Sequence, residues 1–182
     1  MTMTLDEFVA WEQTQDGRHE LEDGQIIALP GGNEAHSAIR ANLLTAAGAK
    51  LRGSGCHTLA SSMLVRTGNG NLRRPDLTID CGLYRADALI APNPTVVVEV
   101  LSADSEIRDR TRKLGDYNAT PTIQHYVLIE QDVMLAHIYC RGPQGDFRFQ
   151  PDKAQGPDGV IRLPAIGISL TMAEVYSSLD FG

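Results

Sequence analysis

Apolar residues recur at helical spacing in three stretches of the chain. Each stretch follows a residue that can cap a helix, so three longer helices are predicted: residues 5–13 after Thr4, 34–51 after Asn33, and a helix that follows Ser105 and ends at about Tyr117. The third helix is expected to bury Ile107, Leu114 and Tyr117 along one side. A short fourth helix is predicted after Thr171, because Thr171 and Glu174 have the spacing of a capping box.

Short apolar or alternating runs predict the strands. The first two form a hairpin within residues 18–29, with its turn at Asp23-Gly24. The other predicted strands are residues 57–60, 63–66, 76–81, 95–101, 124–129 and 134–139, and residues 147–149 are expected to extend the last pair. This order of elements predicts an α/β (α+β) fold in one domain, residues 1–182, with a mixed β-sheet flanked by helices.

The strand at residues 95–101 carries the most informative pattern. It is a nearly unbroken apolar run, typical of a strand buried on both faces, and yet it contains Glu99. Burying an ionised carboxylate without a partner costs several kcal/mol or more. Glu99 must therefore pair with a cation, bind a metal, hold a proton or lie where the strand opens into a cleft. We favour the metal.

A second carboxylate, Asp76, lies on the preceding predicted strand and comes beside Glu99 if the two strands pair. Two close carboxylates raise each other's pKa unless a cation keeps both ionised. Mg²⁺, with Mn²⁺ as the alternative, prefers oxygen ligands, and the carbonyl of Val100 can supply a further one. Lys113, four residues after Asp109 on the predicted helix and expected to share a face with it and with Glu106, could then assist a water that attacks a phosphodiester.

Each of these residues also has a structural interpretation, which the residue pattern leaves open. Asp76 can begin a strand after proline, and Glu99 can form a buried pair with an arginine. Lys113 and Asp109 can form an ordinary surface ion pair of a few tenths of a kcal/mol. His36, near the start of its helix, favours a structural hydrogen-bonding role.

Charge and composition limit the functions that the chain can perform. Its 182 residues carry a formal net charge of −7, which weighs against a bulk electrostatic attraction to nucleic acid. Local basic clusters could still contact phosphates: Arg73-Arg74, and Arg108, Arg110, Arg112 and Lys113. No apolar run approaches the ~18 residues of a membrane span, and the first residues lack the features of a signal peptide, so we expect a cytoplasmic protein. Cys56, Cys81 and Cys140 are typical of buried thiols rather than of a disulfide framework or a zinc site.

Several of these residues together resemble a known family. Pro75-Asp76, Glu99 to Ser102, Asp109, Lys113 and Tyr117 are similar to the pattern of the Uma-two family, described as "putative restriction endonucleases", a branch of the PD-(D/E)xK nuclease superfamily. The resemblance extends to the hairpin His19 to Gly24, to His36 and to residues 124–130, and so covers most of the chain. It implies a restriction-endonuclease-like core.

The resemblance also implies roles for individual residues. Asp76 and Glu99 would be metal ligands, Glu20 a further acidic member of the site and Lys113 the catalytic lysine. In the parent superfamily the lysine lies two residues after the second acid, where this chain has Leu101. The resemblance implies that the lysine has moved to the helix, where Lys113 matches.

Three functions remain in competition on the sequence. The first is a Mg²⁺-dependent endonuclease acting on DNA, for which a homodimer is expected because a two-fold partner matches the symmetry of a duplex. The second is a catalytically inactive nuclease-fold module for binding or regulation, which the negative net charge and Leu101 favour. The third is hydrolysis of another phosphoester by the same residues.

Overall fold

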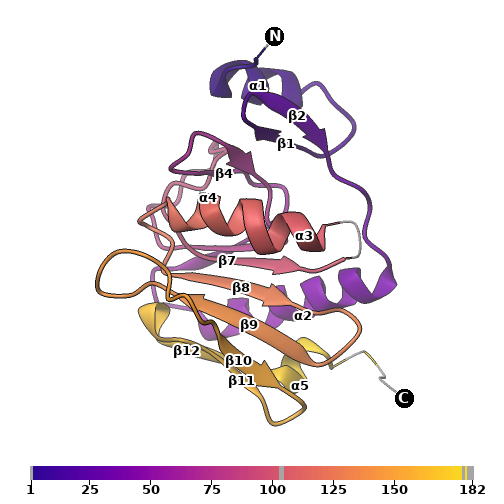
Figure 1. Cartoon of the computed structure of the whole chain (residues 1–182), viewed down its shortest axis with the longest axis vertical. Helices are drawn as coiled ribbons and strands as arrows, with labels where there is room; N and C mark the ends of the chain where they lie inside the picture. Colours follow the sequence, from indigo (N-terminus) through magenta and orange to yellow (C-terminus); the bar gives the residue numbers. More distant parts are fainter. Residues whose placement is uncertain (1, 103–104, 178, 180–182) are drawn as a thin grey trace.

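A six-stranded mixed sheet forms the centre of the fold (Figure 1). The structure is a computed structural model, which describes residues 2–102, 105–177 and 179. In sheet order the strands are β10 (Asp152–Gln155), β9 (Leu135–Cys140), β8 (His125–Ile129), β7 (Pro94–Val100), β6 (Leu77–Asp80) and β3 (His57–Ala60). Strands β7 and β8 are parallel and the other neighbours are antiparallel. The predicted mixed sheet flanked by helices is confirmed.

Helices cover both faces of this sheet, which explains why all seven residues of β7 are buried. On one face α2 (Glu34–Lys50) packs Ile39 and Leu43 against Val96 and Val98. On the other face lies a helical segment made of α3 (Glu106–Arg108), the π-helical turn η1 (Asp109–Lys113) and α4 (Leu114–Asn118). Because side chains alternate along a strand, Glu99 faces this second helical segment.

A smaller unit, formed largely by the N-terminal part of the chain, contributes residues to the side of the central sheet that Glu99 faces. It contains α1 (Leu5–Glu12) and a four-stranded sheet, in the order β2 (Gln25–Ala28), β1 (His19–Glu22), β5 (Leu72–Arg73) and β4 (Val65–Arg66). Asp23 and Gly24 both have positive φ, 51° and 75°, as the predicted two-residue hairpin turn requires. The hairpin turn and the β1–β5 pairing together bring β1 close to the end of β7 that carries Glu99.

The last part of the chain packs against α2, on the face of the sheet that this helix covers. Strands β11 (Val160–Leu163) and β12 (Ile168–Thr171) form a hairpin around a short 3₁₀ turn, η2 (Pro164–Ile166), and α5 (Met172–Val175) follows. The predicted capping boxes at Thr4 and Thr171 and the cap at Asn33 are confirmed. Among the described residues, no helix is long and apolar enough to cross a bilayer.

Several local expectations are wrong. Ser105 makes no capping hydrogen bond through its side chain, and the segment after it is interrupted by the π-helical turn. Ile107 is 81% exposed rather than buried, because the turn shifts the apolar side of the segment to Leu114 and Tyr117. Residues 147–149 form only an isolated bridge from Phe147 to Arg141, and β10 completes the sheet instead.

The cysteine expectation is also wrong. Cys56 and Cys81 form a disulfide bond, and Cys140 is a free buried thiol. The antiparallel register pairs His57 with Asp80, which places the residues just outside this pair opposite each other. A separation of 25 residues in the sequence gives no sign of this proximity.

Candidate active site

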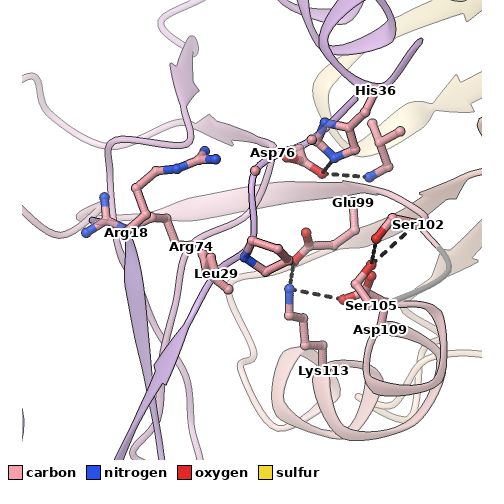
Figure 2. Close-up of a pocket in the computed structure, with 14 residues that line it drawn as sticks. Arg18, Leu29, His36, Arg74, Asp76, Glu99, Ser102, Ser105, Asp109 and Lys113 are labelled. Carbon is pink, nitrogen blue, oxygen red and sulfur yellow. Dashed lines mark hydrogen bonds and ion pairs between the residues drawn. The ribbon is translucent and has the colours of Figure 1, made fainter. Parts of the chain in front are cut away.

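The two predicted acids meet where β6 and β7 lie side by side. In this antiparallel pair Leu77 is opposite Val98, so Asp76, just before β6, lies opposite the end of β7. The amide of Val100 donates a hydrogen bond of 2.8 Å to Asp76 Oδ2. Both carboxylates line one small cavity, which Figure 2 shows together with the residues around it.

Asp76 is held by two residues of α2. His36 Nε2 lies 3.2 Å from Asp76 Oδ2, and Arg40 Nε lies 3.3 Å from Oδ1. His36 and Arg40 are four residues apart and therefore project from the same side of the helix. Burial raises the pKa of Asp76, but the hydrogen bond and charge of His36, the Val100 amide and Arg40 outweigh it, so the pKa is lowered. Asp76 is therefore ionised at neutral pH.

Glu99 has the opposite electrostatic environment. Its Oε1 accepts hydrogen bonds of 2.9 Å from Lys113 Nζ and from the Tyr117 hydroxyl. Burial raises the pKa of Glu99 well above its usual value, and the charges of Asp109, Asp76 and Glu20 add to the rise against the opposing effect of Lys113. Neighbouring carboxyl groups with pKa values displaced in opposite directions are frequent at catalytic sites.

Lys113 lies at the centre of the acidic residues. Its Nζ is 2.9 Å from Glu99 Oε1, 3.0 Å from Asp109 Oδ1 and 3.3 Å from Glu20 Oε1. Its side chain is only 6% exposed, so the alternative of an ordinary surface ion pair is wrong. Burial lowers the pKa of Lys113, but the three carboxylates outweigh this effect and raise it. Lys113 is therefore an ammonium ion at neutral pH.

The π-helical turn η1 holds Lys113 and Asp109 in place, since both are buried residues of this turn. The hydroxyl of Tyr126, from β8, donates to the backbone carbonyl of Asp109 at 3.0 Å and so fixes the turn against the sheet. The expectation that Glu106 shares this face is wrong, because Glu106 pairs with Arg110 at 2.9 Å on the outer side. Single π-helical turns are often found at functional sites.

Glu20 reaches the site from β1 of the hairpin. Its Oε1 accepts from the Arg74 amide at 3.0 Å, and its Oε2 lies 3.1 Å from Arg73 Nη1. Burial raises the pKa of Glu20, but Lys113 and Arg73 outweigh this effect and lower it. Arg73 is completely buried and also contacts Glu22 and Asp116, so the expectation that it touches phosphates is wrong.

The cavity between these groups is small, with a volume of about 70 Å³. Asp109 and Lys113 lie on one side, Arg18 and Arg74 on the other, and the Leu29–Gly32 segment borders it (Figure 2). A water molecule needs ~10–15 Å³ of such volume, so the cavity can hold a few waters or a partly hydrated cation. It is too small to enclose an organic cofactor.

The donor set fits a hard divalent cation. No group of three or more His, Cys, Asp or Glu side chains is arranged around a common point in the described part of the chain. Mg²⁺ needs only one or two carboxylates because it retains several waters, and Asp76 and Glu99 are such a pair. Glu99, Asp109 and Glu20 share the ammonium group of Lys113, and Arg73 also pairs with Glu20. Burial and the neighbouring acids still raise the pKa of Glu99, so added positive charge would be favourable beside it.

Residues that sequence reasoning missed include Arg40 and Ser61, and Arg73 has a structural role in place of the predicted phosphate contact. Arg40 lies four residues after His36, and this helical spacing is the one signal in the sequence that could have identified it. The position of Ser61 depends on contacts that are distant in sequence, because it receives hydrogen bonds from both Arg18 and Arg40.

The chain is similar in sequence to a known family and to two proteins of a cyanobacterial strain. The family model Uma2, described as "Putative restriction endonuclease", matches residues 5–173. Over 181 residues the chain is 31% identical to "Uncharacterized protein slr1290" of Synechocystis sp. (strain ATCC 27184 / PCC 6803 / Kazusa), covering 98% of this chain and 94% of that protein. A second protein of this strain, "Uncharacterized protein sll1609", is 23% identical over 133 residues, covering 71% of this chain and 75% of that protein.

A solved structure shows the same architecture. It is described as "a putative nuclease belonging to DUF820" from Anabaena variabilis ATCC 29413, and it matches with a TM-score of 0.76 and 19% identity. The match covers 96% of this chain and 98% of that chain. The predicted restriction-endonuclease-like fold is thereby confirmed.

Proposed function

Because the chain belongs to the Uma2 family, described as "Putative restriction endonuclease", we propose that it is a metal-dependent endonuclease that hydrolyses phosphodiester bonds of DNA. The observation that supports this proposal most strongly is the position of Lys113. Its ammonium group lies among the carboxylates of Glu99, Asp109 and Glu20 and borders the cavity that Asp76 also lines. Buried acids and a lysine at one cavity are the groups that hydrolysis of a phosphodiester needs.

In this proposal Asp76 and Glu99 hold Mg²⁺ or Mn²⁺, with the carbonyl of Val100 as a further ligand. The ion supplies Lewis-acid polarisation of the phosphate and lowers the pKa of the attacking water. Asp76 is already ionised, and Glu99 gives up its proton when positive charge offsets the acids that raise its pKa. Holding the proton until then keeps the buried site stable without the ion.

Lys113 acts in this scheme as a fixed positive charge. Its raised pKa makes it a poor base, so it orients the attacking water and stabilises the negative charge that develops on the phosphate. Asp109 and Glu20 hold the ammonium group in position through contacts of 3.0 and 3.3 Å. Tyr117 does the same for the Glu99 carboxylate.

A second candidate function is a catalytically inactive nuclease-fold module that binds nucleic acid or regulates a partner. The observation in its favour is that Lys113 is already engaged by three carboxylates in the described chain. Hydrolysis of another phosphoester would use the same site and differ only in the substrate. These candidates are separated by testing for cleavage and for metal binding independently.

Two further properties belong to the proposal. A homodimer would allow both strands of a duplex to be cut by sites related by two-fold symmetry. A cytoplasmic location would give access to DNA, although the Cys56–Cys81 disulfide is unusual for a reducing compartment. Sedimentation of the protein tests for the homodimer. Mass spectrometry of protein alkylated in cells shows whether Cys56 and Cys81 are reduced there, as a cytoplasmic location predicts.

The decisive test of the proposed function is cleavage of supercoiled plasmid and of single-stranded DNA in Mg²⁺, Mn²⁺ or EDTA. We expect metal-dependent cleavage that is lost in Asp76→Asn and in Glu99→Gln. Asp158→Asn is the matched control, because Asp158 is exposed in the turn between β10 and β11. Full cleavage by purified Glu99→Gln would contradict the proposal, and calorimetry with Mn²⁺ separates loss of metal binding from loss of chemistry.

A further inference from the structure

Two arginines converge on one neutral oxygen beside the acidic residues. Arg18 Nη1 donates to Ser61 Oγ at 3.0 Å, and Arg40 Nη2 donates to the same oxygen. Ser61 is buried, with 6% exposure, so water screens this arrangement poorly. Two guanidinium groups repel each other, and a hydroxyl carries no charge to compensate for the repulsion.

The charge of Arg18 is not balanced within the described part of the chain. Arg40 has Asp76 as its counter-ion at 3.3 Å, and the neighbouring Arg74 has Glu12 at 2.7 Å. No carboxylate of a described residue lies within ion-pair distance of Arg18. Burial lowers the pKa of Arg74, and the positive charge of Arg18 lowers it further, so the two cations are close. Arg18 and Arg74 both line the cavity (Figure 2).

We propose that Arg18 and Arg40, whose guanidinium groups both donate to the Ser61 hydroxyl in this structure, bind a backbone phosphate of the nucleic acid, next to the phosphate that is cut at Asp76 and Glu99. A phosphate oxygen can replace the Ser61 hydroxyl as the hydrogen-bond acceptor of both guanidinium groups, and unlike the hydroxyl it carries a negative charge. Arg40 contacts Asp76 through Nε and Ser61 through Nη2, so it links the phosphate site directly to the acidic residues. This inference rests on the proposed function, because it names how the substrate is held beside the cavity, which Arg18 lines and Arg40 reaches through Asp76.

The site also explains how a chain with a net charge of −7 can hold DNA. Arg73, which the sequence offers as a phosphate contact, pairs with internal carboxylates. Arg18 is half-buried at the cavity, and among the described residues its guanidinium group pairs with a hydroxyl rather than with a carboxylate. Arg18 therefore supplies a positive charge beside the acids that no carboxylate of a described residue offsets. Such a site positions the backbone and carries no base specificity.

The test is binding of a short fluorescein-labelled duplex, and of the matching single strand, to the full chain in EDTA at several salt concentrations. We expect Arg18→Ala to weaken binding about tenfold, the effect of losing one charge-assisted hydrogen bond. The slope of log Kd against log salt should fall by about 1, as for the loss of one phosphate contact. Arg18→Lys should keep the slope and recover part of the affinity. Arg162→Ala, an exposed position in β11, is the control and should change neither quantity.

Ser61→Ala distinguishes a binding role from a structural one. It removes the same Arg18–Ser61 hydrogen bond as Arg18→Ala but leaves both guanidinium groups in place. We therefore expect Ser61→Ala to bind DNA as well as the wild type or better. Equal weakening in the two variants, or an unchanged affinity and salt slope in Arg18→Ala, would overturn the inference.

Failure of this inference can be told apart from failure of the proposed function, because binding in EDTA requires no cleavage. Arg18-dependent binding without any metal-dependent cleavage would support the phosphate site and contradict the endonuclease. Metal-dependent cleavage with unchanged KM and kcat in Arg18→Ala would support the endonuclease and overturn the phosphate site. An absence of binding by the wild type in EDTA would also overturn it.

Discussion

Replacing Glu99 by glutamine should stabilise the metal-free protein. The amide keeps the shape of the side chain, and its oxygen can still accept from Lys113 and Tyr117. Lys113 also retains Asp109 and Glu20 as counter-ions, so the change leaves no unpaired ammonium group. The variant therefore removes the need for this side chain to take up a proton on folding at neutral pH, and changes little else.

The sign and size of the effect follow from the pKa of Glu99. Burial, with Asp109, Asp76 and Glu20, raises this pKa above the usual 4.5. Above pH 4.5 the unfolded chain has lost the proton and the folded chain retains it, so stability falls as the pH rises toward the folded-state pKa. Each unit of such a rise corresponds to ~1.4 kcal/mol. We expect Glu99→Gln to gain about 1 kcal/mol or more at neutral pH, which is about 2–4 °C in Tm for a chain of this size.

The assay is thermal unfolding in EDTA from mildly acidic to neutral pH, with Asp158→Asn as the control. The wild type and Glu99→Gln should melt together near pH 4.5, and the variant should melt at a higher temperature as the pH rises. Added Mg²⁺ should raise the Tm of the wild type only, because the ion requires the carboxylate. A lower Tm for Glu99→Gln at neutral pH in EDTA would refute the reasoning, since the ion pair with Lys113 would then outweigh burial.

Two further predictions concern the residues that hold the site. Arg73→Met should cost about 3–5 kcal/mol in urea unfolding, because it removes the cation that pairs with the buried carboxylate of Asp116 and one of the two cations beside Glu20. A cost below about 1 kcal/mol would show that these acids simply take up protons. His36→Ala should raise the pKa of Asp76, because His36 has the largest effect among the groups that lower this pKa. Calorimetry should then show a lower Mn²⁺ affinity at mildly acidic pH and a recovered affinity at alkaline pH. An equal loss of Mn²⁺ affinity at every pH would show instead that His36 is itself a metal ligand. The matched control is His57→Ala, because His57 lies beside the opposite end of β6.

Local signals predicted those parts of the fold that depend on neighbouring residues. Caps at Thr4 and Asn33 and the Asp23-Gly24 turn are properties of short segments, and each is confirmed. Glu99 marked the position of the cavity because a charge in an apolar run has few structural explanations. The neighbouring strand then brought Asp76 beside it.

Features that depend on distant contacts could not be predicted. Two-residue strands such as β5 have no periodicity to detect, and the Cys56–Cys81 disulfide depends on the register of β3 against β6. Arg73 and Arg74 look alike in the sequence, but the partners of Arg73 come from β1 and α4, so its burial is decided by tertiary structure. The π-helical turn was likewise invisible, because its residues suit an α-helix equally well.

A change at the π-helical turn can alter the cavity while leaving the fold intact. Such a turn accommodates one more residue than an α-helix, and α4 is anchored in the core through Tyr117. A descendant that lost one residue here would keep the sheet and α4. The preceding part of the helix would rotate by about 100° relative to α4, the turn per residue of an α-helix, and Asp109 would leave its present position at the cavity. A single gap at this point in an aligned relative would therefore mark a lineage that kept the scaffold and lost this arrangement of the cavity.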